Sequence, residues 1–141
     1  SNSAVASMGY DLPAAIGIWA ASRKDGAYSM GAAREGEDVI LITGDGSIQM
    51  NLQELQTIIH HKMGIKIFII NNGGYHSIRQ TQKNFFGEPL VGAGYDSGDL
   101  SFPDMEKLSA AYGYPYVRAE HNGQLAEAVE KDPCHGRTGD L

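Results

Sequence analysis

The stretch ITGDGSIQMNLQELQTIIHHKMGIKIFIINNGGY, residues 42–75, contains the pattern from which the fold is predicted. Two continuous apolar runs, Val39–Ile42 and Ile65–Ile70, flank a segment from about Ser47 to Lys62 whose apolar residues recur at helical spacing. The runs predict strands, the first covered on both faces, and the spacing predicts a helix that Gly64 ends. A strand, a helix and a strand of these lengths predict a parallel, right-handed βαβ unit.

Further elements are expected on both sides of this unit. They are a buried helix over residues 11–22, a helix from Ser101 or Phe102 to Gly113 with Pro103 in its first turn, a third strand over 114–119 and a last helix capped by Asn122. Residues 73–101 show no clear period, which indicates a functional loop such as a lid, or disorder. The tail KDPCHGRTGDL has no strand character, so either the sheet lacks a final strand or the chain ends before it. The predicted class is α/β, a parallel sheet with helices on both faces.

Composition limits the classes of protein to consider. The chain has 141 residues, 42% of them hydrophobic, which suffices for one domain with a core. Its net charge is −6. Scattered negative charge does not suit nucleic acid, and no apolar run reaches the roughly 20 residues of a membrane span. The one cysteine, Cys134, excludes a disulfide framework and favours a reducing compartment, so we expect a cytoplasmic protein. The opening SNSAVASMGYDLP reads as the middle of a longer polypeptide.

Both predicted strands end in polar, glycine-rich turns. Parallel α/β sheets bind ligands outside the carboxyl ends of their strands, where a following helix presents N–H groups suited to phosphate oxygens. The first strand leads into Gly44, Asp45, Gly46 and Ser47, and the second into Asn71, Asn72, Gly73 and Gly74. A dinucleotide fingerprint fits less well, because Gln49 stands where its third glycine belongs.

A carboxylate beside a phosphate calls for a cation. Asp45 would repel a phosphate bound at the N–H groups of Gly46 and Ser47, and a divalent cation between them removes the repulsion. Mg²⁺ prefers oxygen ligands, and Asp45 offers a carboxylate, Asn72 a side-chain amide oxygen and Gly74 a backbone carbonyl. These residues predict a diphosphate bridged by Mg²⁺.

The same segment carries a family resemblance. Residues 44–72 resemble the thiamine-diphosphate signature, a GDG turn followed after a helix and a strand by NN, and MGYDLPAAIG, residues 8–17, is similar to the preceding helix of acetolactate synthases. The resemblance implies that residues 1–141 form the C-terminal diphosphate-binding domain, with its thiamine-diphosphate-binding fold, of a longer multidomain enzyme. It implies a metal site of Asp45, Asn72 and Gly74, and a cofactor site of Gly44, Asp45, Gly46, Ser47, Asn72, Gly74, Tyr75 and His76. The implied cofactors are thiamine diphosphate and Mg²⁺.

A finer resemblance concerns the reaction. Ser77 to Asp104 is similar to acetolactate-synthase-like proteins of bacterial surface-polysaccharide pathways, which implies acyl transfer from a 2-oxoacid, such as pyruvate, to a carbonyl acceptor such as a keto-sugar. The alternative is a 2-oxoacid decarboxylase or lyase of the same superfamily, although Ile78 stands where pyruvate-type decarboxylases carry a Glu. The resemblance also implies a homo-oligomer when full length. A second subunit would usually supply the missing pyrimidine-binding domain and its catalytic acid, so the chain alone should be inactive.

Other assignments stay open. No catalytic residue is assigned, and His76 is only a weak candidate for proton transfer. The polar side chains that follow it, Arg79 among them, either contact an acceptor or face solvent. One alternative class is a receiver-like signalling domain with Asp45 as phospho-acceptor, although no suitable Lys follows Ile70. Another is a purely structural domain whose GDG and NNGG are ordinary turns.

Overall fold

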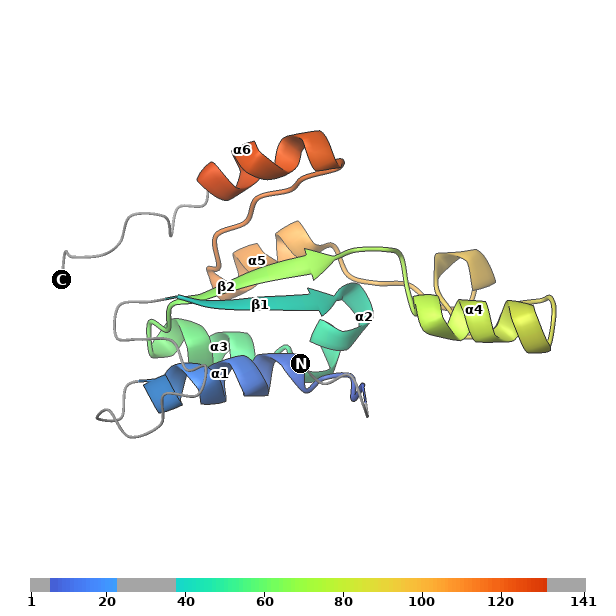
Figure 1. Cartoon of the computed structure of the whole chain (residues 1–141), viewed down its shortest axis with the longest axis horizontal. Coiled ribbons are helices and arrows are strands. Elements are labelled where there is room, and N and C mark those ends of the chain that lie inside the picture. Colours follow the sequence, from blue (N-terminus) through green and yellow to red (C-terminus); the bar gives the residue numbers. More distant parts are fainter. Residues whose placement is uncertain (1–5, 23–37, 132–141) are drawn as a thin grey trace.

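The computed structural model describes residues 6–22 and 38–131. The predicted link over residues 23–37 and the tail from residue 132 on, with Cys134, lie outside these ranges. The described chain is α/β, with two strands and helices gathered around them (Figure 1). No helix among the described residues is long and apolar enough to cross a membrane.

The predicted βαβ unit is confirmed as the centre of the fold. β1 (Val39–Gly44) and β2 (Ile65–Ile70) pair in parallel, with Val39 opposite Ile65 and Gly44 opposite Ile70. Because paired residues of parallel strands share a face, residues 39, 41 and 43 lie on the same face as 65, 67 and 69. Both strands run toward the end of the molecule that carries α2 and α4 (Figure 1).

One face of this sheet lies against the core. α1 (Asp11–Ser22) has the predicted bounds, and its Leu12 and Ala15 are buried. They join residues of both strands and of three further helices in one cluster, composed of Leu12, Ala15, Val39, Ile48, Leu55, Ile58, Ile65 and Met105. Burial of these apolar side chains is the main force that holds the helices to the sheet.

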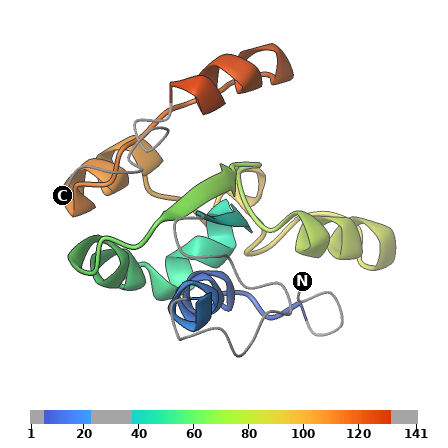
Figure 2. The same cartoon turned by 60° about the vertical axis from the view of Figure 1, so that its left-hand side comes forward.

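The other face of the sheet corrects one prediction. β1 was expected to be covered on both faces, but Ile40 and Ile42 are 65% and 70% exposed and Ile70 of β2 is 56% exposed. α6 (Leu125–Glu130) lies on this side of the sheet in both views, opposite α1 (Figures 1 and 2). Its own apolar residues Leu125 and Val129 are also exposed. Within the described residues the strand is therefore buried on one face.

The helix expected from about Ser47 to Lys62 is interrupted. It begins two residues earlier, as α2 (Asp45–Ile48), tightens into the 3₁₀ turn η1 (Gln49–Asn51) and resumes as α3 (Glu54–His60). The tight turn coincides with tethering to the N-terminal segment: the Asn51 side-chain amide donates to the Gly9 carbonyl at 2.6 Å, and Ser47 Oγ accepts from the Gly9 N–H at 2.9 Å. Tertiary hydrogen bonds thus accompany the break, which apolar spacing does not reveal.

The C-terminal part departs further from prediction. α5 (Met105–Tyr112) begins after Pro103, because Asp104 caps it by accepting the N–H groups of Glu106 and Lys107. Gly113 ends α5 in the left-handed conformation, as expected.

The predicted third strand over 114–119 is absent; its second residue is Pro115, which has no N–H to donate to a ladder. Asn122 opens the 3₁₀ turn η3 (Asn122–Gln124) before α6, without a side-chain cap.

Residues 73–101 also hold more structure than predicted. They contain the helix α4 (His76–Phe85) and the 3₁₀ turn η2 (Tyr95–Ser97). α4 buries no residue and extends away from the sheet in both views (Figures 1 and 2). α4 contains only two apolar residues, Ile78 and Phe85, too few to mark it as a helix by a recurring apolar face.

Candidate functional site

The side chain of Asp45 joins the two sequence motifs. Asp45 follows β1 directly and is 1% exposed. Its Oδ2 accepts the N–H groups of Gly73 at 2.8 Å and Gly74 at 3.0 Å, and its Oδ1 accepts the N–H of Gly46 at 2.9 Å. The GDG and NNGG turns therefore meet at one carboxylate, as the parallel topology predicts.

These contacts explain how a carboxylate can be buried here. An ionised carboxylate taken out of water needs hydrogen bonds or opposite charge in compensation. Three backbone N–H groups supply charge-assisted bonds, and a carboxylate retains further lone pairs for another ligand. The burial of Asp45 also fixes the direction of its oxygens, since the backbone of both turns holds them.

The other two predicted metal ligands have oxygens available. The Asn72 side chain and the Gly74 carbonyl accept no hydrogen bond from the described residues, and Asn72 is exposed. A carboxylate, an amide oxygen and a carbonyl form the hard donor set that suits Mg²⁺. No group of three or more His, Cys, Asp or Glu side chains that could hold a metal occurs in the described parts of the chain. The predicted set, with one acidic residue, is of a different kind.

The predicted diphosphate residues surround the same carboxylate. Gly46 is packed under the ring of Tyr75: a Cβ on Gly46 would lie 2.3 Å from Tyr75 Cε1. Ser47 Oγ accepts the Gly9 N–H, and Gly44 ends β1. His76 is exposed and begins α4. The fold thus gathers these predicted cofactor residues at one end of the sheet.

The segment before the site is anchored to it. The Thr43 hydroxyl donates to Asp11 Oδ2, while Asp11 Oδ1 accepts the Leu12 N–H at 2.8 Å. Thr43 is buried, two residues before Asp45. The segment over residues 8–17 therefore supports the site through side-chain and backbone hydrogen bonds.

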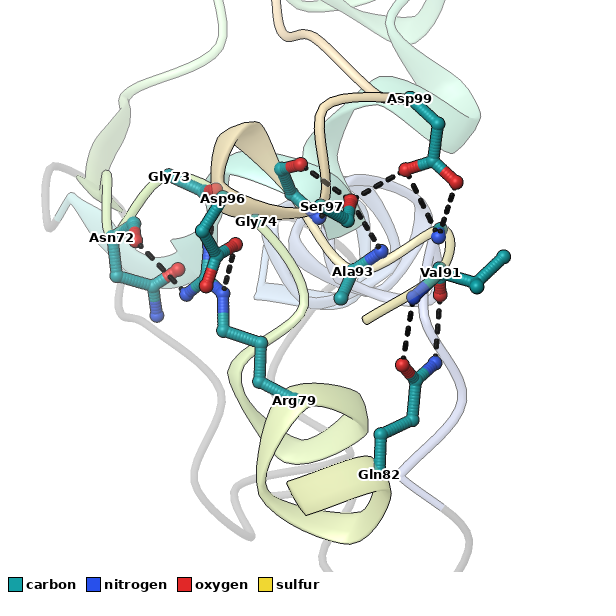
Figure 3. A network of polar contacts seen from close by, with 12 residues as sticks. Asn72, Gly73, Gly74, Arg79, Gln82, Val91, Ala93, Asp96, Ser97 and Asp99 are labelled. Carbon is teal, nitrogen blue, oxygen red and sulfur yellow. Dashed lines mark hydrogen bonds and ion pairs between the residues drawn. The ribbon is translucent and has the colours of Figure 1, made fainter. Parts of the chain in front are cut away.

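Sequence reasoning left the role of Arg79 undecided, and the structure places this side chain against the loop over residues 72–74 (Figure 3). Nη2 donates to the Gly73 carbonyl at 2.5 Å and Nη1 to the Asn72 carbonyl at 3.4 Å. Nε donates to Asp96 Oδ1 at 2.8 Å, in an ion pair. No periodicity or motif in the sequence predicts these contacts, because they depend on how α4 and η2 fold back on the loop over residues 72–74.

A second set of contacts holds residues 91–99 to α4. The Gln82 amide donates to the Val91 carbonyl at 2.7 Å and accepts the Val91 N–H at 2.8 Å. Asp99 accepts the Gly92 N–H at 2.9 Å and the Ser97 hydroxyl at 2.5 Å (Figure 3). Gln82 lies three residues after Arg79, so both project from one face of the helix. The Gln82 side chain thus links α4 to this segment by two hydrogen bonds.

Two carboxyl groups of the segment have altered acidity. The hydrogen bond from Arg79 lowers the pKa of Asp96, and the charge of Arg79 acts in the same direction. The hydrogen bond from the Ser97 hydroxyl lowers the pKa of Asp99, followed by that from the Gly92 N–H. Both groups are therefore ionised at neutral pH.

The chain matches known proteins over most of its length. Residues 1–138 match the model of the family "Thiamine pyrophosphate enzyme, C-terminal TPP binding domain". The chain is similar to the acetolactate synthase large subunit of Cyanidium caldarium, with 37% identity over 131 residues that make up 93% of the chain and 20% of the relative. It is 40% identical over 130 residues to that of Pyropia yezoensis, covering 92% of the chain and 20% of the relative. Acetolactate synthase isozyme 3 large subunit of Escherichia coli is 32% identical over 128 residues, 88% of the chain and 20% of the relative. The chain thus spans about a fifth of the length of these relatives.

Proposed function

The chain belongs to the family of C-terminal domains that bind thiamine pyrophosphate, also called thiamine diphosphate, and from this premise we propose that it holds the cofactor's diphosphate through Mg²⁺. Thiamine diphosphate is the cofactor of the family, and acetolactate synthases use it with Mg²⁺. In our proposal the metal ligands are the Asp45 carboxylate, the Asn72 side-chain oxygen and the Gly74 carbonyl. Family membership argues against the receiver-like and purely structural alternatives.

One observation carries this proposal. Asp45, which follows β1, accepts hydrogen bonds from the N–H groups of Gly73 and Gly74, which follow β2. The proposed metal ligands, although far apart in sequence, therefore lie close together. Asn72 and Gly74 keep oxygens that no described residue engages. The donor types fit Mg²⁺, which commonly takes one or two protein carboxylates together with phosphate and water.

The diphosphate would lie beside this metal. We assign it to Gly44, Gly46, Ser47 and the backbone of residues 74–76, at the end of the sheet where α2 begins. At Gly44 the backbone is open to a ligand, since even an added Cβ would meet no atom within 4 Å. His76, exposed at the start of α4, stays a weak candidate for proton transfer.

The reaction follows from the family. Thiamine diphosphate supplies the carbanion chemistry, and this domain would bind and orient it. We propose decarboxylation of a 2-oxoacid followed by carboligation, with an acyl unit transferred to a carbonyl acceptor such as a keto-sugar. A decarboxylase or lyase of the same superfamily is the second candidate, and Ile78 in place of the expected Glu argues against a simple decarboxylase.

The remaining proposals concern the whole enzyme. We place it in the cytoplasm as a homo-oligomer, in which a second subunit supplies the pyrimidine-binding domain and the catalytic acid. The exposed face of the sheet would be covered in that context. The domain alone would bind the cofactor without turnover.

Isothermal titration of thiamine diphosphate at saturating Mg²⁺ tests the metal site. The expected result is heat of binding that EDTA abolishes and that Asp45→Asn removes, because the amide lacks the charge that holds Mg²⁺. Asp38→Asn is the matched control: Asp38 precedes the opposite end of β1 and pairs with Lys66 at 3.0 Å, so its loss should leave binding unchanged.

The titration should be repeated with a polypeptide that also carries the pyrimidine-binding domain. This arm separates weak binding by the domain from the absence of a site. Binding in either form that survives both EDTA and Asp45→Asn would contradict the proposed ligands. No binding in both forms would contradict the proposed function.

A further inference from the structure

We propose that Arg79 is a positioning residue that selects which oxygens of the loop over residues 72–74 face the metal. The inference rests on the proposed function, because it concerns the same site. It assigns a role to a side chain that binds neither metal nor cofactor. The oxygens of this loop fall into two groups, those that Arg79 binds and those that stay available to a metal.

The division is visible in the hydrogen bonds. The guanidinium of Arg79 engages the backbone carbonyls of Asn72 and Gly73, which are absent from the predicted ligand set. The two oxygens that are in the set, the Asn72 side chain and the Gly74 carbonyl, accept no hydrogen bond from the described residues. Arg79 therefore holds the non-ligand carbonyls and leaves the ligand oxygens available.

A planar guanidinium suits this task. It presents donors in a fixed fork, so its contacts with two successive carbonyls and with Asp96 define one orientation of the loop. The Arg79 side chain is 15% exposed, which limits its freedom to leave. A lysine would keep the charge but present one ammonium group, which cannot reproduce the three directions.

The loop is also held by residues 93–95. Gly74 forms an antiparallel bridge with Gly94, in which the Tyr75 N–H donates to the Ala93 carbonyl at 2.8 Å and the Tyr95 N–H to the Gly73 carbonyl at 3.3 Å. The Gly73 carbonyl thus receives donors from both Arg79 and Tyr95. A shift of the Arg79 guanidinium would therefore move the Gly73 carbonyl, which is next to the proposed ligand Gly74.

Asp96 balances the charge of this arrangement. A guanidinium near a divalent cation would repel it, and the ion pair of Arg79 with Asp96 at 2.8 Å offsets that repulsion. Asp96 is more exposed than its partner, at 43%. The ion pair can therefore place the planar guanidinium beside the loop over residues 72–74 while the net charge of Arg79 and Asp96 together stays near zero.

The test compares metal affinity and metal preference in variants of the full chain. Arg79→Ala should weaken Mg²⁺ binding, measured with thiamine diphosphate present, by about 10–100-fold, as is typical for partners of metal ligands. It should also raise the ratio of Ca²⁺ to Mg²⁺ affinity, because Mg²⁺ demands near-ideal octahedral geometry and Ca²⁺ tolerates displaced oxygens. General destabilisation would weaken both ions alike and leave this ratio unchanged.

Two further variants separate geometry from charge. Compared with Arg79→Ala, Arg79→Lys should show the same raised ratio of Ca²⁺ to Mg²⁺ affinity but recover part of the Mg²⁺ affinity. The lysine restores the positive charge without the planar set of guanidinium donors. Asp96→Asn should weaken both ions without changing their ratio, because the guanidinium stays on the carbonyls while its charge is uncompensated. Lys83→Ala is the control, since it removes a positive charge from the same helix and touches no loop carbonyl in the described structure. It should leave the ratio unchanged.

A readout without cofactor distinguishes failure of this inference from failure of the proposed function. Amide hydrogen exchange of Tyr95 N–H, whose acceptor is the Gly73 carbonyl, should be faster in Arg79→Ala than in the unaltered chain. Wild-type affinity and ion preference in Arg79→Ala, with binding still lost in Asp45→Asn, would overturn the inference alone. Absence of any Mg²⁺-dependent binding in the unaltered protein would overturn both, while the exchange rates would still report whether Arg79 holds the loop.

Discussion

Gly46 shows how one missing side chain shapes the site. Gly46 lies beside Asp45, and the Tyr75 ring occupies the space that a Cβ would need, with Cε1 at 2.3 Å and Cδ1 at 2.8 Å. The same ring packs edge-on against Phe102, with centroids 5.7 Å apart. A glycine at this position therefore lets an aromatic side chain from beyond β2 close over the turn that follows β1.

Gly46→Ala should destabilise the protein by about 1–3 kcal/mol, because the added methyl group displaces the Tyr75 ring. Gly17→Ala is the matched control: Gly17 lies inside α1, and a Cβ added there would meet no atom within 4 Å, so alanine should stabilise by up to about 1 kcal/mol. Urea unfolding measures both. Equal stability of Gly46→Ala and the unaltered chain would show that the ring yields without cost.

The helix α4 is held by polar side chains rather than by apolar burial. It has no buried residue; Arg79 connects it to Asp96 in η2, and Gln82 connects it to Val91 in the loop before η2. Asp99 and Ser97 close that loop on itself. Hydrogen bonds of this kind contribute about 0.5–1.5 kcal/mol each, so we expect α4 and its loop to open more readily than the sheet.

Acid should loosen the loop through Asp99. Its pKa is lowered from the ordinary value of 3.8, mainly by the hydrogen bond from Ser97. A lowered folded-state pKa means that the ionised carboxylate stabilises the loop above the unfolded-state pKa, and that this contribution is lost as pH falls through the folded-state value. NMR titration should show the Gly92 N–H signal changing with a midpoint below 3.8.

Asp99→Asn provides the comparison for this titration. The amide does not ionise, so the acid-induced change in the Gly92 signal should disappear. A midpoint at or above 3.8 in the unaltered chain, or an identical acid response in the variant, would contradict the assignment.

The described molecule has a core on one side of its sheet. α1, α2, α3 and α5 contribute to the cluster on the inner face, whereas Ile40, Ile42 and Ile70 are exposed on the outer face. The site lies at the edge of this arrangement, where both strands end and α2 and α4 begin (Figure 1). Stability and cofactor binding are therefore expected to respond to different residues.

Two isoleucines test this asymmetry. Ile58→Ala should destabilise by about 2–5 kcal/mol, because Ile58 is 1% exposed and its loss leaves a cavity. Ile42→Ala should cost less than about 1 kcal/mol, because that side chain is 70% exposed. Urea midpoints of both variants measure the difference. Similar losses would mean that the outer face is buried in solution.

The elements that local patterns predicted well are those with strong periodicity and a clear stop. β2 and α1 have the expected bounds, and Gly113 ends α5, because apolar spacing and end residues act over a few positions. The meeting of Asp45 with the NNGG turn also followed from sequence, since parallel strands bring their carboxyl ends to one edge. The family and its cofactor were predicted from the same two motifs, and the comparisons confirm them.

Other features depend on contacts between distant residues. The break in the helix after β1 coincides with hydrogen bonds to Gly9, and α4 is held by side-chain contacts with residues 91 and 96. Arg79 belongs to this group, because its three hydrogen-bond partners are brought together only when α4 and η2 fold back on the turn after β2. Short-range periodicity determines which segments can form strands and helices, whereas long-range hydrogen bonds and burial determine where they break and what they hold in place.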